Sequence, residues 1–366
     1  MYKVKIYGAG SIGNHMAYAC RKKGWDVLIC DVDSMALERT KKDIYPSRYG
    51  HWDDGIRLMR VDAAANEEFD VVIIGTPPDT HIKIAVNTLK NSSPKVLLIE
   101  KPLCTPSLEG CDDLWNLANS TNTFVGVGYN HTLTKNTLLA TEVLDGGLIG
   151  RPLTVNAKFR EYWGGIFRAH PWLTGPRDSY LGFSERGGGA SGEHSHAISI
   201  WQYFSYIVGA GRIVEVSSML DMVDDNETKY DRICYINVKT EKGLVGNITQ
   251  DVITEPSQKN LRVQGTNGLL KWYVNWDNDH DAIRYWDGKG EVNEKFIKKT
   301  RQSDFDSEMN HLEEVLIGKD IDSPISIRRG LETMLVIAAA NISNRLKKTV
   351  GINYKKGFSL EAIEHE

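Results

Sequence analysis

The stretch that decides the fold lies near the start of the chain and reads Val4-Lys5-Ile6-Tyr7-Gly8-Ala9-Gly10-Ser11-Ile12-Gly13. A short apolar strand signal leads into a G-x-G-x-x-G spacing, and helical periodicity follows it. In this context Gly8 permits a tight turn, Gly10 lets the backbone approach a diphosphate, and Gly13 lets helix and strand pack closely. The free amides at the helix start attract phosphates. The motif therefore predicts a dinucleotide-binding β-α-β unit.

An acidic residue supports this prediction. Asp31 follows the second predicted strand, Val27–Cys30, and Asp33 lies nearby. A carboxylate here can accept hydrogen bonds from both ribose hydroxyls of an adenosine, and its charge repels a 2′-phosphate. We therefore expect NAD rather than NADP. The alternative is a glycine turn without a ligand, but the strand context and the acidic residue favour the nucleotide.

The first third of the chain alternates strand and helix signals, which predicts parallel β-α-β units with right-handed crossovers. The predicted strands are Val4–Tyr7, Val27–Cys30, Asp70–Ile74, Lys95–Glu100 and Phe124–Tyr129, and the predicted helices are Asn14–Lys23, Ser34–Asp43, His81–Lys90 and Leu108–Ser120.

Longer alternating segments follow, which are typical of an antiparallel or mixed sheet. The predicted strands are Leu153–Glu161, Ile213–Met219, Arg232–Thr240, Gly243–Gln250, Asn260–Gly265 and Gly268–Val274, and the predicted helices are Leu138–Asp145, Glu193–Ile207, Phe305–Ile317 and Ile327–Lys347. The fold class is thus α/β: a Rossmann domain over residues 1–129, then an α+β domain over residues 130–366 with a large open, mostly antiparallel sheet. The last helix can pack back on the first domain.

The composition of the chain argues against several classes of function. The 366 residues carry 44 Lys and Arg against 48 Asp and Glu, a net charge of −4, so no basic face indicates nucleic acid. Apolar runs are too short to span a membrane, and no secretory signal precedes the first strand. The 5 cysteines are scattered and form no C-x-x-C pair. We expect reduced thiols, a cytoplasmic protein and no metal site.

An ordered set of short motifs resembles the Gfo/Idh/MocA oxidoreductase family. The motifs are Gly75-Thr76-Pro77-Pro78-Asp79-Thr80-His81, Glu100-Lys101-Pro102, Gly128-Tyr129-Asn130 and Gly147-Leu148-Ile149-Gly150. The resemblance covers nearly the whole chain and implies a C-terminal sheet that covers the active site. It also implies that Lys101 approaches the nicotinamide and the reacting carbon, where a lysine can polarise a hydroxyl or carbonyl. Without this resemblance, a solvated surface lysine would be the better interpretation.

The glycine motif and the resemblance together define the expected cofactor contacts. These are Gly8, Gly10, Ser11, Ile12, Gly13, Asp31, Thr76, Pro77, His81, Glu100, Lys101 and Asn130.

A histidine-rich segment follows three glycines at positions 187–189. Glu193 and His196 match an acid and a histidine of the family pattern, so the resemblance implies that Lys101 and His196 are the catalytic pair. Ser199 stands where the family usually has a second acid, and a hydroxyl supplies no negative charge. Proton transfer then rests on the catalytic pair, with Glu193 or His194 as possible helpers. A histidine at a helix start can also be a cap or a core residue.

The long loop Trp163–Gly189 carries His170-Pro171-Trp172, which resembles a subgroup associated with acylneuraminate-type and surface-polysaccharide sugars. Rings stack on sugar faces and guanidinium groups bind carboxylate or phosphate, whereas surface packing is the alternative for each residue. The candidate substrate contacts are Arg160, Tyr162, Trp163, Arg168, Arg177, Tyr180, Glu193 and His194. Trp272, Tyr273 and Trp276 belong either to a homodimer or homotetramer interface or to a packed core.

The resemblance implies an NAD-dependent oxidoreductase that moves a hydride between nicotinamide and a carbinol or carbonyl of a sugar or sugar derivative, with a nucleotide sugar or a surface-polysaccharide precursor as one possibility. One alternative is an enzyme that uses tightly held NAD transiently, for epimerisation or glycoside elimination. Another is a non-catalytic NAD or sugar sensor, to which Ser199 lends some weight.

Overall fold

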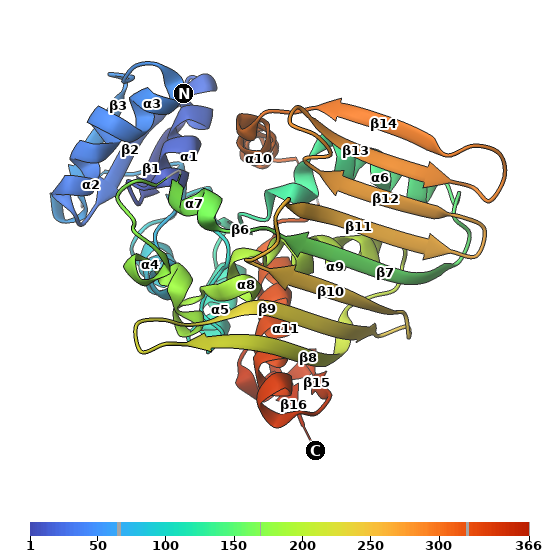
Figure 1. Cartoon of the computed structure of the whole chain (residues 1–366). Helices are drawn as coiled ribbons and strands as arrows, with labels where there is room; N and C mark the ends of the chain where they lie inside the picture. Colours follow the sequence, from blue (N-terminus) through green and yellow to red (C-terminus); the bar gives the residue numbers. More distant parts are fainter. Residues whose placement is uncertain (64–66, 169, 320–321, 366) are drawn as a thin grey trace.

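The structure is a computed structural model that describes residues 1–63, 67–168, 170–319 and 322–365. Two sheets organise the chain, and helix α10 (Arg301–Leu316) stands between them (Figure 1). None of the described helices is long and apolar enough to cross a membrane.

The smaller sheet has six strands in the order β3-β2-β1-β4-β5-β6, and all its pairings are parallel. Its strands are β1 (Lys3–Tyr7), β2 (Asp26–Asp31), β3 (Ile56–Arg60), β4 (Val71–Ile74), β5 (Val96–Ile99) and β6 (Phe124–Val127). Every residue of β4 and β5 is buried, because helices cover both faces of a parallel sheet. The order reverses between β1 and β4, and ligands bind at such a switch point.

The helices of this part follow the strands in sequence. They are α1 (Ser11–Lys22), α2 (Ser34–Arg39), α3 (Tyr45–Tyr49), α4 (Pro78–Asn91) and α5 (Cys111–Ser120). The helix expected over Ser34–Asp43 is interrupted by a π-helical turn, Thr40–Ile44. Thr40 is fully buried there and donates a hydrogen bond to the carbonyl of Ala9, a tertiary contact that fixes the turn against the glycine loop.

The larger sheet has ten strands in the order β14-β13-β12-β11-β7-β10-β9-β8-β15-β16. Only β7 and β10 pair in parallel among these described strands; the other pairings are antiparallel. The strands are β7 (Pro152–Arg160), β8 (Ile213–Asp224), β9 (Lys229–Thr240), β10 (Val245–Asp251), β11 (Gln258–Gly265), β12 (Leu269–Val274), β13 (His280–Trp286), β14 (Asn293–Lys298), β15 (Val350–Ile352) and β16 (Ile363–Glu364). The expected mostly antiparallel sheet is thus confirmed.

Helices pack on one face of the large sheet and leave the other open (Figure 1). The remaining helices are α6 (Lys135–Asp145), α7 (Gly164–Arg168), α8 (Gly189–Glu193), α9 (His196–Ile207) and α11 (Ile327–Leu346). Burial alternates along β9, where Cys234, Ile236 and Val238 face the helices. Helix α11 also contacts β6 and α5, so it joins the large sheet to the small one.

The sequence patterns do not predict β3, β13, β15, β16, α3, α7 or the short 3₁₀ turns between residues 176 and 186. The helix expected over Glu193–Ile207 begins only at His196, as α9, and Glu193 ends the separate short helix α8. Of the three aromatic residues proposed for a core or an interface, Trp272 belongs to the core, where its indole N–H donates to the Thr137 hydroxyl at 2.9 Å. Trp276 remains 40% exposed.

Candidate active site

The glycine loop after β1 adopts the geometry that its spacing predicts. Gly8 has φ +103°, and its amide donates to the carbonyl of Cys30 at 2.8 Å. A Cβ on Gly13 would lie 2.0 Å from the Gly8 carbonyl oxygen, so only glycine fits there. A Cβ on Gly10 would meet nothing within 4 Å, which leaves open space at the N-terminus of α1. The loop therefore fits the diphosphate of a dinucleotide.

Asp31 braces this loop from the end of β2. One carboxylate oxygen accepts a hydrogen bond from the Ala9 amide at 2.8 Å, and the other accepts one from the Asp33 amide at 2.9 Å. Asp33 in turn accepts from the Met35 amide and caps α2. The acidic residue thus has a structural role as well as a position suited to a ribose.

A cavity of about 660 Å³ opens between the carboxyl ends of β5 and β6 and the large sheet. Its wall includes nine of the residues proposed from the sequence, namely Ser11, Ile12, Glu100, Lys101, Asn130, Tyr162, Glu193, His194 and His196. Segments far apart in the chain thus meet at one site. The same wall includes functional candidates that sequence reasoning missed: His15, Arg48, His131, Glu161, Lys259 and Arg301.

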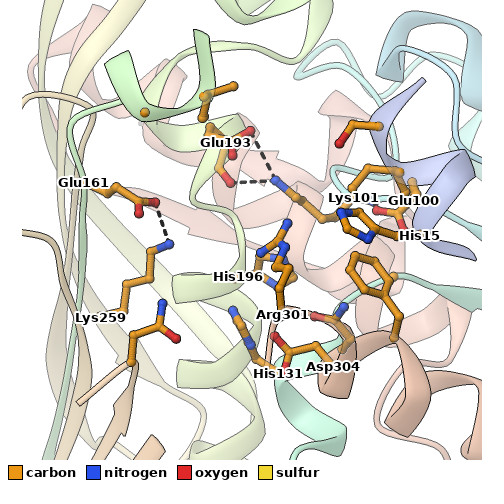
Figure 2. A pocket seen from close by; sticks show the side chains of 18 of the residues that line it. His15, Glu100, Lys101, His131, Glu161, Glu193, His196, Lys259, Arg301 and Asp304 are labelled. Carbon is orange, nitrogen blue, oxygen red and sulfur yellow. Dashed lines mark hydrogen bonds and ion pairs between the residues drawn. The ribbon is translucent and has the colours of Figure 1, made fainter. Parts of the chain in front are cut away.

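Lys101 is held by a single carboxylate partner across this cavity. Its ammonium donates to the Glu193 carbonyl oxygen at 2.9 Å and to the Glu193 carboxylate at 3.2 Å (Figure 2). The Lys101–Pro102 peptide bond is cis. Burial would raise the pKa of Glu193, but the Lys101 ammonium and His194 outweigh it and the pKa is lowered. The Glu193 carboxyl is therefore ionised and contacts Lys101 just beyond the carboxyl end of β5.

His196 opens α9 and faces the same space (Figure 2). Burial, reinforced by the Lys101 ammonium, holds the pKa of His196 well below its usual range, so the ring is neutral. Its Nδ1 is buried and has no hydrogen-bond partner among the described residues. The ring of His131 lies 4.5 Å away between centroids, and burial lowers its pKa as well. Two neutral imidazoles thus lie side by side in the cavity wall.

A buried carboxyl lies behind Lys101. Burial raises the pKa of Glu100 to about 7, although the Lys101 ammonium opposes this shift. Glu308 of α10 is fully buried nearby, and its pKa is raised by burial and by the charge of Glu100. Two carboxyls with raised pKa therefore underlie the cationic side of the cavity.

Besides the glycine loop and Asp31, three cofactor candidates lie outside the cavity wall, namely Thr76, Pro77 and His81. A Cβ on Gly8 would lie 3.2 Å from the Thr76 amide, which places Thr76 and Pro77 beside the loop. His81 is fully buried, with its ring nitrogens 2.6 Å from the Thr76 carbonyl and 3.1 Å from the Pro102 carbonyl. It connects the two loops that flank the cavity rather than facing open space.

The structure places several substrate candidates away from the cavity. Arg160 pairs with Asp251 at 2.5 Å, and Arg177 pairs with Glu227 at 3.0 Å on the surface. Arg168 and Trp163 line a shallower hollow beside the long loop. Tyr180 and Ser199 also lie outside the cavity wall: Tyr180 is half-buried in a 3₁₀ turn, and Ser199 is buried in α9.

The sequence around the cavity residues that were not predicted gives little indication of their position in the site. His131 directly follows the Gly128-Tyr129-Asn130 motif and could have been proposed from that neighbourhood. Arg301 begins α10, 200 residues beyond Lys101, and reaches the cavity only because α10 packs against α1. Glu161 directly follows β7 and Lys259 belongs to the neighbouring β11, so their contact depends on the order of the strands in the sheet. In the described part of the chain, no group of three His, Cys, Asp or Glu residues could hold a metal ion.

Comparison with known proteins covers both sheets. Residues 2–129 match the family described as an oxidoreductase family with an NAD-binding Rossmann fold, and residues 137–271 match the GFO/IDH/MocA C-terminal domain. An NAD-binding oxidoreductase from Klebsiella pneumoniae superposes with a TM-score of 0.76 at 18% identity, over 96% of this chain and 98% of that one. A levoglucosan dehydrogenase with bound NADH and L-sorbose superposes with a TM-score of 0.76 at 17% identity, over the same shares.

The matches to curated relatives cover a smaller part of each protein than the structural superpositions do. A 1-carboxy-3-chloro-3,4-dihydroxycyclohexa-1,5-diene dehydrogenase from Comamonas testosteroni is 27% identical over 229 residues, 61% of this chain and 50% of that protein. A glycosyl hydrolase family 109 protein from Shewanella pealeana is 23% identical over 312 residues, 75% of this chain and 63% of that protein. The chain thus spans between half and two thirds of these relatives' length. With both of its halves matched, the chain belongs to the Gfo/Idh/MocA oxidoreductase family.

Proposed function

We propose that this protein is an NAD-dependent oxidoreductase that acts on a hydroxyl or carbonyl group of a sugar or polyol. The observation that carries the proposal is the meeting of Lys101 and neutral His196 at one cavity, beside a glycine loop suited to a diphosphate. The names of relatives that act on levoglucosan and inositol support the substrate class.

Lys101 and His196 have separate roles at the substrate oxygen. The Lys101 ammonium, oriented by Glu193, hydrogen-bonds that oxygen and stabilises its negative charge as the O–H bond breaks. A ring nitrogen of neutral His196 accepts the proton. Bound NAD⁺ would supply the acceptor for the hydride that leaves the same carbon. Reduction of a carbonyl uses the same groups in reverse.

A substrate panel tests this function. Purified protein is mixed with NAD⁺ and with neutral sugars and polyols, and the absorbance of reduced nicotinamide is followed. We expect time-dependent reduction with at least one compound. No reduction of NAD⁺ by any sugar, and no oxidation of NADH by any keto sugar, would contradict the proposal.

We also propose that NAD is preferred over NADP. Asp31 places a carboxylate at the end of β2, where it suits a ribose and repels a 2′-phosphate. The expected result is a lower Kd for NADH than for NADPH by at least about tenfold, measured by fluorescence titration. Equal affinities would overturn this part of the proposal.

Transient use of tightly held NAD is the second candidate function. It is favoured by the match to glycosyl hydrolase family 109 proteins and to an α-N-acetylgalactosaminidase from Tannerella forsythia, which is 29% identical over 130 residues, 34% of this chain and 26% of that protein. A chromogenic N-acetylgalactosaminide separates the two functions. Cleavage without net NADH supports the second candidate, whereas stoichiometric NADH from a free sugar supports the first.

We further propose a cytoplasmic homo-oligomer that assembles through the open face of the large sheet. All five cysteines are buried and free, which suits a reducing compartment. Exposed apolar side chains on the sheet face are Met219, Tyr235 and Val245. Such a patch is a typical protein–protein contact.

A further inference from the structure

The cavity wall opposite Lys101 holds a second ion pair that the proposed chemistry does not use. Glu161 follows β7, and its carboxylate lies 2.5 Å from the ammonium of Lys259 on β11. Their side chains are 34% and 17% exposed. Figure 2 shows the pair across the cavity from Glu100 and His15. The pair therefore lies at the far end of the space that a substrate would occupy.

The hydrogen-bonding capacity of this pair matches a sugar. An ammonium has three N–H donors and a carboxylate has about four acceptor positions, so one mutual contact leaves donors and acceptors free. A hydroxyl group both donates and accepts. Two neighbouring hydroxyls of a ring can thus bind together, one donating to Glu161 and the other accepting from Lys259.

His194 adds a third polar group to this wall. It is 3% exposed, and its Nε2 lacks a hydrogen-bond partner within the described residues. Burial, together with the Lys259 ammonium, lowers the pKa of His194 to about 4, so its ring is neutral. A buried imidazole nitrogen without a partner is costly unless a ligand satisfies it.

The distribution of charge indicates which substrates fit. Both lysines of the cavity wall already have a carboxylate partner, since Lys101 pairs with Glu193 and Lys259 pairs with Glu161. Arg160 and Arg177, which the sequence suggested for an acidic sugar, have carboxylates of their own. At this end of the cavity, a carboxylate or phosphate on the substrate would meet Glu161 without gaining a free cation.

Two arginines of the cavity wall, Arg48 and Arg301, lie beside α1, and Arg301 also lies close enough to His196 to lower the pKa of that histidine. Arg48 donates to the carbonyl and hydroxyl oxygens of Ser11 at 2.9 and 2.8 Å, at the start of α1. Arg301 stacks over Phe305, whose ring lies on that of His15 in α1. Neither arginine forms an ion pair with a carboxylate of the described chain. Their charge complements a diphosphate at the glycine loop.

We propose that Glu161 and Lys259, with His194, form a subsite for a vicinal diol, and that the substrate is therefore an uncharged sugar or polyol rather than a uronic acid or a nucleotide sugar. This inference rests on the proposed oxidoreductase function. Glu161 and Lys259 determine specificity and take no part in the proton transfer at Lys101.

The first test compares matched substrates. Rates of NAD⁺ reduction are measured with glucose, galactose, levoglucosan and myo-inositol, and with glucuronate and galacturonate. We expect kcat/KM for the best neutral compound to exceed that for its carboxylate counterpart by at least about tenfold. A uronate that is the better substrate overturns the inference and leaves the oxidoreductase function intact.

The second test removes the subsite. For Glu161→Gln we expect KM for the best neutral compound to rise about tenfold while kcat changes less than about threefold. Single deoxy analogues give the decisive readout. Wild type should reject the analogue that lacks one diol hydroxyl by at least about tenfold, and Glu161→Gln should reject it by less than about threefold. Lys259→Met should behave in the same way and replaces Glu161→Gln if that variant fails to fold.

Glu215→Gln is the matched control. Glu215 pairs with Lys239 at 2.7 Å on strands of the same sheet, but both side chains are 46% exposed and outside the cavity. It should leave KM, kcat and analogue discrimination unchanged. Unaltered discrimination in both subsite variants contradicts the inference. If no compound is turned over, calorimetry with the NADH complex decides: absence of binding by every neutral compound overturns both proposals, and binding without turnover overturns only the proposed function.

Discussion

The Lys101 side chain is held in place by one residue, Glu193, because its ammonium contacts both the carbonyl and the carboxylate of Glu193. For Lys101→Ala we expect kcat to fall by at least about 100-fold, since Lys101 is the group proposed to stabilise the charge on the reacting oxygen. NADH binding should change less than about threefold, because the glycine loop is untouched. Stopped-flow rates and fluorescence titration measure the two quantities. Lys239→Ala, an exposed lysine with its own carboxylate partner, is the control. Full turnover by Lys101→Ala would exclude the assigned role.

Glu100 gives a pH dependence whose sign follows from burial. Its folded-state pKa is about 7, above the usual value of 4.5, so the folded chain keeps a proton that the unfolded chain releases between these pH values. This group therefore lowers the free energy of unfolding as pH rises from 4.5 to 7.

We expect Glu100→Gln to remove this decrease in the free energy of unfolding with rising pH. Between pH 5 and 7, the free energy of unfolding of the variant should fall less than that of wild type, by about 1–3 kcal/mol. Urea unfolding at a series of pH values measures it. Glu361→Gln, which changes an exposed glutamate, should follow wild type. Parallel curves for wild type and Glu100→Gln would show that Glu100 has no raised pKa.

At the element scale, the short helix α8 depends on a buried acid from β9. Asp231 accepts hydrogen bonds from the Ser191 amide at 2.7 Å and from the Ser184 hydroxyl at 2.8 Å. Helix α8 ends at Glu193, so Asp231 positions the partner of Lys101. We expect Asp231→Ala to lower the free energy of unfolding by about 2–4 kcal/mol, measured with urea, and to reduce kcat.

Asp221→Ala is the control for this position. Asp221 is an aspartate of β8 that pairs with Arg232 at 2.6 Å on the exposed surface. Its loss should cost less than about 1 kcal/mol. Equal effects of the two substitutions would mean that the buried hydrogen bonds of Asp231 contribute nothing special to α8.

Elements differ in how far the sequence predicts them. Helix α1 and strand β1 follow from local periodicity and the glycine motif, and α11 follows from its apolar face. The break at Thr40 does not, because it depends on a hydrogen bond to the Ala9 carbonyl across the fold. Strand β3, Ile56–Arg60, lacks a strict alternation of apolar and polar residues and forms by pairing with β2.

The residues of the candidate site also differ in how far the sequence predicts them. Glu100, Lys101, Glu193 and His196 are found from motifs, because each motif keeps its residues close in sequence. Arg301 and the Glu161–Lys259 pair require knowledge of which helix and which strands become neighbours. Arg160 has a side chain that suits sugar binding, but its guanidinium forms an ion pair with Asp251. The sequence does not reveal this partner.

At the scale of the whole molecule, the open face of the large sheet remains without a covering layer in a single chain (Figure 1). Met219 and Tyr235 are directly paired across β8 and β9 and are 72% and 41% exposed, and Val245 on β10 is 53% exposed. Burial of such side chains favours association by about 25 cal/mol for each Å² removed from water. We expect a homodimer or larger assembly in solution, measured by light scattering.

A single charge on this face should dissociate the assembly, because a carboxylate buried against an apolar partner surface is strongly unfavourable. We expect Tyr235→Glu to halve the measured mass or reduce it further while NADH still binds, since the glycine loop lies in the other sheet. Phe296→Glu changes an exposed aromatic residue on the edge strand β14 and should leave the mass unchanged. Monomeric wild-type protein, or dissociation only with Phe296→Glu, would place the contact elsewhere or remove it.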